Sequence, residues 1–272
     1  MALKETKNEP KDLIEITPEA VEQIEEEIEK LEKSEDSNTQ NLQILRGKRR
    51  ESRDDAKTSL AAWTPRTKLG IKVKAGKEKD IDKILEKDKR ILEAEIVDFL
   101  LPIETDLILI GQAKGKFGGG KRRAWRQTQK KTQEGNVLSF SAMAVAGDKN
   151  GHIGVGFGKA RETLPAREKA VRHSKLNIMR IERGFESPEL ESEKSDPHTV
   201  PFKVKGKCGS VHITLIPAPR GTGLVTGDEC KKILRLAGIK DVYVKTKGKT
   251  KTAFNMIKAC FNALSKTTKL EI

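Results

Sequence analysis

The clearest alternation of apolar and polar positions lies in the middle of the chain. Residues 137–146 alternate in a way that predicts a β-strand with one face more apolar than the other. Residues 152–157 predict a second strand. Between them, Asp-Lys-Asn-Gly at 148–151 predicts a tight turn, because Asn and Gly tolerate positive φ. The second strand has a face without side chains, where another backbone or a sugar-phosphate could approach closely. We predict close packing at six glycines in the chain: Gly151, Gly154, Gly156, Gly158, Gly221 and Gly223.

A helix is expected after the second strand, with Pro165 in its first turn, where a missing N–H is harmless. At about 100° per residue, one side of this helix is apolar and carries Ala166, Ala170, Val171, Ser174 and Ile178. Arg167 falls on that apolar side and breaks the pattern. The opposite side carries Lys169, Arg172 and Lys175, and the helix entrance adds Lys159 and Arg161. We interpret these cations as a phosphate-binding face, and a merely solvated face is the alternative.

Upstream, residues 106–110 predict another strand, and residues 113–131 predict a long loop with three consecutive glycines. The loop contains no acidic residue, and Phe117 and Trp125 are interleaved with its charges. Cations bind phosphates and aromatic rings stack on unpaired bases, so an RNA-inserting loop is predicted, with a localisation tract as the alternative. The predicted RNA-binding residues here are Lys114, Lys116, Lys121, Arg122, Arg123, Trp125, Arg126, Lys130 and Lys131.

The C-terminal third has its own periodic pattern. Strands are expected at 198–206, 211–217 and 242–245, and helices at 228–237 and 252–264, which gives a β-β-α-β-α unit. The first of these helices should end at Gly238. The glycine-rich turn before it contains Arg220, Gly221 and Gly223, and Arg220 is expected to touch either RNA or solvent.

The N-terminal part is organised differently. An amphipathic acidic helix is expected after Thr17, and it either docks on a partner protein or is a solvated tail. A basic stretch follows at 41–58. Trp63 comes next, and we expect it to anchor its own segment, with stacking on a base as the alternative. Short helices are expected at 80–87 and 93–101. The predicted organisation is an extension with a basic linker at 1–58, a lead-in at 59–103, a β-β-β-α domain at 104–181 and an α/β domain at 197–272, in the α+β class.

Composition narrows the class of partner. The formal net charge is +14, but residues 1–39 contain 5 Lys against 13 acidic residues, so the remainder carries +22. Such a basic chain indicates a polyanionic partner. The three cysteines fit no zinc spacing and are expected to be reduced. No apolar run of about 18 residues occurs, so we expect a soluble, intracellular protein without membrane contact.

No catalytic pattern emerges, and we expect neither an enzyme nor a cofactor or metal. Gly154-x-Gly-x-Gly-Lys has neither dinucleotide-binding nor P-loop spacing. The turn around Arg220 resembles a kinase phosphate turn, but no Asp-Lys pair accompanies it. The four histidines, which are expected to be surface or hairpin residues, show no spacing for a triad or a metal site: His152, His173, His198 and His212.

One long stretch resembles a known family. Residues 138–178, LSFSAMAVAGDKNGHIGVGFGKARETLPAREKAVRHSKLNI, are similar to the core signature of the universal family of small-ribosomal-subunit protein five. The family's Pro-x-Ala-x-x-Lys-Ala step is altered, because Ala166 comes one residue early. Trp-x-Pro-x-Thr-x-Leu-Gly at 63–70 and EIVDFLLP at 95–102 resemble the lead-in of archaeal and eukaryotic members. PAPRGTGL at 217–224 and AGIKDV at 237–242 resemble the family's C-terminal domain, so the similarity covers roughly residues 60–272.

This resemblance implies a double-stranded-RNA-binding-like domain at 104–181 and a structural role in the small ribosomal subunit, in the cytoplasm. It implies binding to rRNA near the mRNA entry channel, contact with small-subunit protein families three, four, eight and possibly two, and support of translational accuracy. Proteins of this kind read A-form shape and phosphates more than sequence. The alternative is a free-standing double-stranded-RNA-binding regulator or chaperone.

Overall fold

The computed structural model describes residues 63–87, 90–113, 122–186 and 196–268. These residues belong to one compact unit, Trp63–Ile272. The predicted acidic helix, the basic linker and the loop tip with Lys114, Lys116 and Lys121 lie outside the described residues. Within the described part, no helix has the length and apolar character that a membrane crossing requires.

The described elements include runs of helices and runs of strands, as in the α+β class. In chain order they are α2 (Lys68–Lys74), α3 (Ile81–Glu86), α4 (Ala94–Leu100), β1 (Glu104–Leu107), β2 (Trp125–Thr132), β3 (Gly135–Gly147), β4 (His152–Ala160), α5 (Thr163–Leu176), β5 (Ile178–Arg180), β6 (Val204–Cys208), β7 (Val211–Pro217), β8 (Leu224–Val225), α6 (Asp228–Ala237), β9 (Val242–Lys247) and α7 (Ala253–Leu264).

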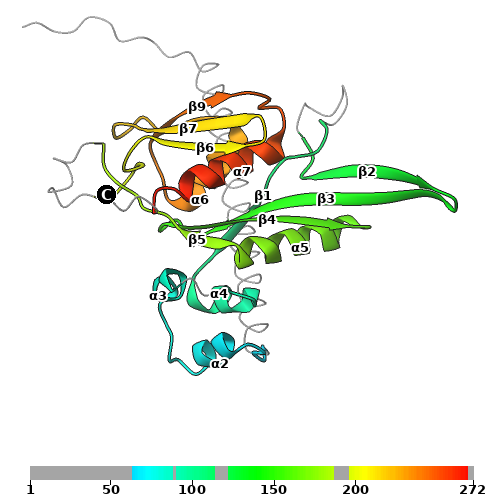
Figure 1. Cartoon of the computed structure of the whole chain (residues 1–272), viewed down its shortest axis with the longest axis horizontal. Coiled ribbons are helices and arrows are strands. Elements are labelled where there is room, and N and C mark those ends of the chain that lie inside the picture. The colour runs from blue at the N-terminus through cyan, green and yellow to red at the C-terminus, as the bar shows by residue number, and fades with distance from the viewer. Residues whose placement is uncertain (1–62, 88–89, 114–121, 187–195, 269–272) are drawn as a thin grey trace, which may run out of the picture. The chain divides into compact units, whose positions relative to one another are not determined.

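The strands form two sheets. In the first, the order is β1-β3-β4-β5 and all pairs are antiparallel. Because β3 is 13 residues long, its second half pairs with β1 and its first half pairs with β2. The second sheet has the order β6-β7-β9-β8, with β8 parallel to β9. Figure 1 shows the layers in sequence: the second sheet, then α6 and α7, then the first sheet, then α5.

Helix α5 packs on the first sheet at backbone distance. On the face toward α5, β3 presents Ala142 and Ala144, and the residues paired with them in β4 are Gly158 and Gly156. A Cβ atom placed on Gly156 would lie 2.1 Å from the carbonyl oxygen of Ala170 and 2.1 Å from the amide nitrogen of Ser174. Gly154 and Gly158 meet α5 in the same way. The backbone that approaches these three glycines is therefore the chain's own helix.

The opposite face of the first sheet is buried as well. Met143 and Val145 of β3 and Ile153 of β4 belong to a cluster of buried side chains that continues into α6, α7 and the second sheet. The β3–β4 turn is held against α6, because the amide of Lys149 donates to the carbonyl oxygen of Leu236 at 2.9 Å. The described core therefore continues from the first sheet to the second. The proposed boundaries of the four segments stay a prediction.

A smaller core holds the lead-in. Val73, Ile84 and Ile96 are buried together, and Ile178 of β5 contributes to the same cluster. The Glu93 carboxylate accepts hydrogen bonds from the indole of Trp63 at 3.1 Å and from the backbone amides of residues 66 and 67. Burial alone would raise the pKa of Glu93, but these hydrogen bonds lower it below its ordinary value. Trp63 thus anchors its own segment, as predicted.

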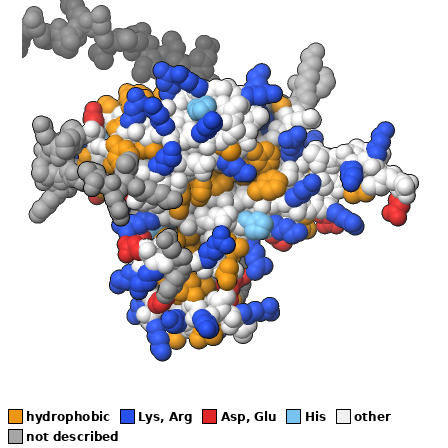
Figure 2. All heavy atoms as spheres, viewed as in Figure 1, with side chains coloured by type: hydrophobic (Ala, Val, Ile, Leu, Met, Phe, Trp, Pro, Cys, Tyr) orange, Lys and Arg blue, Asp and Glu red, His pale blue; other side chains and the backbone are white. Residues whose placement is uncertain are grey.

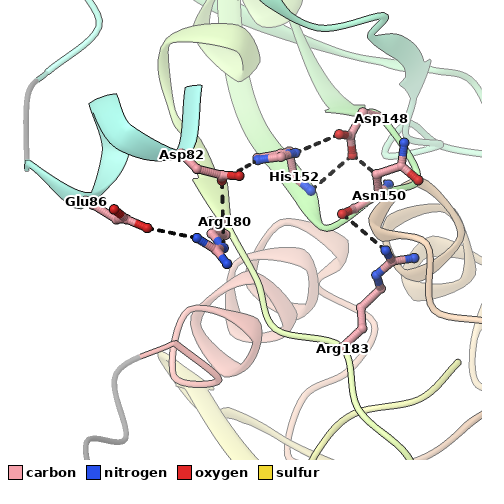
Figure 3. A network of polar contacts seen from close by, with 7 residues as sticks. All are labelled: Asp82, Glu86, Asp148, Asn150, His152, Arg180 and Arg183. Carbon is pink, nitrogen blue, oxygen red and sulfur yellow. Dashed lines mark hydrogen bonds and ion pairs between the residues drawn. The ribbon is translucent and has the colours of Figure 1, made fainter. Parts of the chain in front are cut away.

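A buried histidine joins the lead-in to the first sheet (Figure 3). The His152 ring lies 2.6 Å from an Asp148 carboxylate oxygen through Nδ1 and 2.9 Å from an Asp82 oxygen of α3 through Nε2. Arg180 of β5 adds an ion pair at 3.0 Å to Glu86 at the other end of α3. Burial opposes the charged ring and lowers its pKa, but the two carboxylates outweigh that effect, so the pKa of His152 is raised.

The histidine predictions hold only in part: His152 lies in the β3–β4 hairpin, as expected, but His152 and His198 are not surface residues. His152 is buried and pairs with two carboxylates, one of which is 70 residues away in sequence and beyond the reach of any local pattern. His198 is also buried, and neither ring nitrogen has a hydrogen-bond partner among the described residues. His173 and His212 are exposed, as expected.

The α+β class is confirmed, but the predicted element order is incomplete. Most of strand β2 falls within the predicted loop at 113–131. This stretch carries no strand signal in its sequence, because the residues of β2 are mostly polar and exposed and show no apolar alternation. Helix α2 and the two short strands β5 and β8 were also missed, and β6 starts six residues later than expected. Helix α6 and its end at Gly238, with φ of 84°, agree with the prediction.

Replacing Gly156 with Ala should lower the free energy of unfolding by about 3 kcal/mol, since neither α5 nor β4 can yield at the backbone. The measurement is chemical denaturation followed by circular dichroism. Gly227→Ala is the control, because its added Cβ meets only the end of the Met256 side chain, at 3.3 Å, and the Glu229 carboxylate, at 3.6 Å. Equal stability losses in the two variants would contradict the backbone contact.

The His152 network should make stability depend on pH. Because the folded-state pKa of His152 is raised, its contribution is complete below the ordinary value of about 6.5 and is lost as pH rises through the folded value. The wild type should therefore lose its advantage over His152→Gln as the pH is raised from 6, measured by thermal unfolding. His212→Gln, at an exposed position, is the control. A difference between wild type and His152→Gln that stays constant up to pH 9 would exclude the charged network.

Candidate nucleic-acid interface

A two-stranded arm extends from the first sheet. Strand β2 pairs with residues 135–142 of β3, and in Figure 1 this hairpin projects beyond the other strands. Every residue of β2 after Trp125 is exposed, and so are the first four residues of β3. An isolated two-stranded ribbon is marginally stable in water. Within the described chain, the arm buries too little apolar surface to be stabilised by its own packing. This is typical of an element that contacts a partner.

The charge of the arm is mostly positive. Arg126 and Lys130 lie on one face of β2, and Lys131 lies on the other, because side chains alternate along a strand. Glu134, in the turn, is the one acidic residue between 125 and 142. Figure 2 shows basic side chains spaced along the arm. The structure thus places three of the predicted RNA-binding cations on an exposed ribbon instead of a loop.

Trp125 anchors the base of the arm. Its ring lies 5.0 Å from the guanidinium carbon of Arg167 on α5 and 5.9 Å from that of Arg123. Both distances are within the range of a cation–π interaction. The ring therefore has partners within the chain and is not the freely available stacking surface that the sequence suggested. Arg167 was missed as a functional residue, although its break in the helix pattern was the available signal.

A cavity of about 630 Å³ opens beside this anchor. It lies between the base of the arm and the beginning of α7. Among the described residues no acidic side chain lines it, and its polar lining includes Gln112, Arg123, Arg126, Lys251, Thr252 and Asn255. A basic, acid-free hollow next to an exposed ribbon is suited to phosphate groups.

The cations around α5 fall into two groups. Lys159, Arg161, Lys169 and Arg172 are exposed. Lys175 is different, because its ammonium donates to Asp98 of α4 at 2.7 Å and its side chain is mostly buried. Arg122 likewise pairs with Glu229 at 3.3 Å. These two side chains tie elements of the chain together, so they are less available to phosphates than the sequence suggested.

The glycine-rich turn after β7 does not pack closely. No atom of the described residues lies within 4 Å of a Cβ placed on Gly221 or Gly223, so the prediction of close packing is wrong for these two positions. Both have positive φ, which is the reason that the turn needs glycine. At Gly151, φ is 107° and a Cβ would lie 3.1 Å from a carbonyl oxygen, so conformation and space both favour glycine. Arg220 is exposed and donates to the carbonyl oxygen of Asp196 at 3.4 Å.

An α+β core that carries a bare cationic arm and an acid-free hollow is typical of the class of proteins that bind nucleic acid. Two family models match this chain: the N-terminal domain of ribosomal protein S5 at residues 124–182, and its C-terminal domain at residues 206–271.

Similar proteins extend over most of the chain. The small ribosomal subunit protein uS5 of Nanoarchaeum equitans is 46% identical over 215 residues, which are 79% of this chain and 91% of that protein. The uS5 proteins of Aeropyrum pernix and Hyperthermus butylicus are 44% and 46% identical over 79% and 76% of this chain and 91% and 90% of their own lengths. The chain therefore belongs to the uS5 family of small-subunit ribosomal proteins.

Removing the Arg167 guanidinium should loosen the base of the arm. Arg167→Ala should speed hydrogen–deuterium exchange across 125–142 and cost about 1 kcal/mol of stability, the usual size of a partly buried cation–π contact. Arg172→Ala, on the exposed side of the same helix, is the matched control. If both variants leave exchange in the arm unchanged, the Trp125 anchor does not hold it.

Proposed function

We propose that this protein is a structural constituent of the small ribosomal subunit, where it binds small-subunit rRNA and neighbouring ribosomal proteins. The observation that carries the proposal is the exposed cationic arm on the fold of a uS5 family member. No catalytic chemistry is assigned, and the function requires no cofactor.

RNA binding would use charge and shape. The arm, with Arg126, Lys130 and Lys131, reaches out from the core and neutralises phosphates on either side of the ribbon. The exposed Arg161, Lys169 and Arg172 extend this surface, with Arg172 on the side of α5 away from the sheet. Lys159 lies in β4 next to Gly158, which faces α5, so the Lys159 side chain points to the opposite face of the sheet. Phosphates and A-form geometry, more than base sequence, would be recognised.

Protein neighbours are expected at the lead-in. Ile71, Leu92 and Phe99 are more than half exposed there, although each is a large apolar side chain. Apolar surface of this kind is suited to another protein. The family resemblance suggests small-subunit protein families three, four, eight and possibly two as these neighbours. It also suggests a place near the mRNA entry channel, with contact to mRNA and a role in decoding accuracy, in cytoplasmic ribosomes.

A free-standing double-stranded-RNA-binding regulator or chaperone is the other candidate. It is less well supported, because such a protein needs no second sheet that shares a continuous core with the first. The family relatives that this chain covers almost completely are named as ribosomal proteins.

Sedimentation of the tagged protein from cell lysate tests the proposal. It should migrate with small subunits and whole ribosomes on a sucrose gradient and remain there at moderately high salt. Substituting Arg126, Lys130 and Lys131 by Gln should lower the salt at which it dissociates. With an rRNA fragment, the log–log slope of affinity against salt should fall by about 2, at roughly 0.7–0.9 per phosphate contact.

The control variant removes the same charge elsewhere. Lys72, Lys83 and Lys231 each pair with a carboxylate of the described chain, so their substitution by Gln should leave sedimentation unchanged. A wild-type protein that stays at the top of the gradient would favour the free regulator. Equal effects of the two triple variants would remove the arm from the interface.

A further inference from the structure

The second sheet has a face that no described element covers. Helices α6 and α7 pack on one of its sides, as Figure 1 shows. Val204 and Gly206 of β6 and Ile213 and Leu215 of β7 are buried on that side. A Cβ on Gly206 would lie 2.1 Å from the carbonyl oxygen of Ala259 in α7, which confirms its direction. The residues that alternate with these four must point away from the helices.

The outward residues form two matching rows across three strands. Lys205 of β6, Thr214 of β7 and Lys245 of β9 are directly paired, and they form the first row. The second row, two residues further along, consists of Lys207, His212 and Lys247. All four lysines are exposed, and no acidic residue occurs in β6, β7, β8 or β9. None of the four pairs with a carboxylate of the described chain.

The spacing of the lysines is regular. Neighbouring rows are about 7 Å apart along a strand, and the two lysines of a row are roughly 10 Å apart across the middle strand. The ammonium groups can therefore hold successive anionic groups of one extended polymer. Long, rotatable lysine side chains suit phosphates as point charges.

An aromatic ring lies in the next row along the strands, beside the first row of lysines. Tyr243 of β9 is 40% exposed and pairs with Ile216 of β7 on one side and with Val225 of β8 on the other. It is the one tyrosine of the chain. A tyrosine supported by two apolar neighbours presents a flat surface on which an unpaired base can stack.

We propose that this outer face, formed by Lys205, Lys207, Lys245, Lys247 and Tyr243, binds a single-stranded RNA segment. The four lysines hold its phosphates and Tyr243 stacks on one base. This surface lies outside the arm and the α5 face. Lysine is depleted in protein–protein interfaces, and the apolar part of the face is confined to one end, so RNA fits better than a protein. The inference deepens the proposed function, on which it rests for the presence of RNA.

The test uses the full chain and two RNA probes, a fluorescent 12-nucleotide oligouridine and a 16-base-pair duplex. Substituting the four lysines by Gln should weaken oligouridine binding at least tenfold and lower its salt slope by about 3, at roughly 0.7 per contact. Duplex affinity should stay within about twofold. Tyr243→Ala should cost about tenfold for the oligouridine, and Tyr243→Phe, which keeps the ring, should restore it.

A control variant of equal charge separates the face from general charge effects. Lys72, Lys83, Lys149 and Lys231, each paired with a described carboxylate, are replaced by Gln. Equal oligouridine binding by this variant and the sheet variant would overturn the proposal. So would a sheet variant that keeps the oligouridine but loses neighbouring ribosomal proteins, since that would make the face a protein interface.

The probe measurements do not depend on ribosome assembly, so they separate this inference from the proposed function. If the wild type fails to sediment with small subunits but binds oligouridine through the face, only the ribosomal role fails. Photo-crosslinking of 4-thiouridine-labelled cells then identifies the source of the strand. Crosslinks at the Tyr243 peptide to rRNA or to mRNA both support the face, and their absence would overturn it.

Discussion

The structure depends on one contact, the approach of helix α5 to strand β4 at backbone distance. Gly154, Gly156 and Gly158 leave no space for a side chain, and the alanines of β3 next to them keep the same face shallow. Packing at this distance gains many dispersion contacts from small residues and leaves no adjustable side chain between the elements. The helix is therefore fixed relative to the sheet, and its cationic side is fixed in direction with it.

The rest of the described unit is arranged around that rigid pair. The side of the first sheet away from α5 is covered by α6 and α7, and these helices in turn support the second sheet. Among the strands, the β2–β3 arm and the outer face of the second sheet remain without cover from the described chain. Both are rich in lysine or arginine and poor in acid. A folded core surrounded by uncovered cationic strands can stay monomeric in solution and still present large areas to a polyanion.

The lead-in is held by polar contacts as much as by apolar ones. Glu93 organises the segment around Trp63, and His152 and Arg180 attach α3 to the first sheet. Lys175 of α5 pairs with Asp98 of α4 in the same way. Charged side chains that the sequence offers equally to RNA thus divide into two groups. Lys175, Arg180 and His152 pair with carboxylates of other elements and hold those elements together, whereas the exposed cations of the arm have no carboxylate partner in the described chain.

The sequence alone determined the elements whose pattern is local. The glycines of β4, the periodicity of α5 and α6 and the family signature predicted the α+β class and the cationic helix. Tertiary structure decided the rest, because those contacts join residues far apart in the chain. Strand β2 exists because β3 extends far enough to pair with it, although its own residues are polar. Asp148 and Asp82 together raise the pKa of His152, and Asp82 lies 70 residues away in sequence. Arg167 lies on the apolar side of its helix, where it contacts the Trp125 ring.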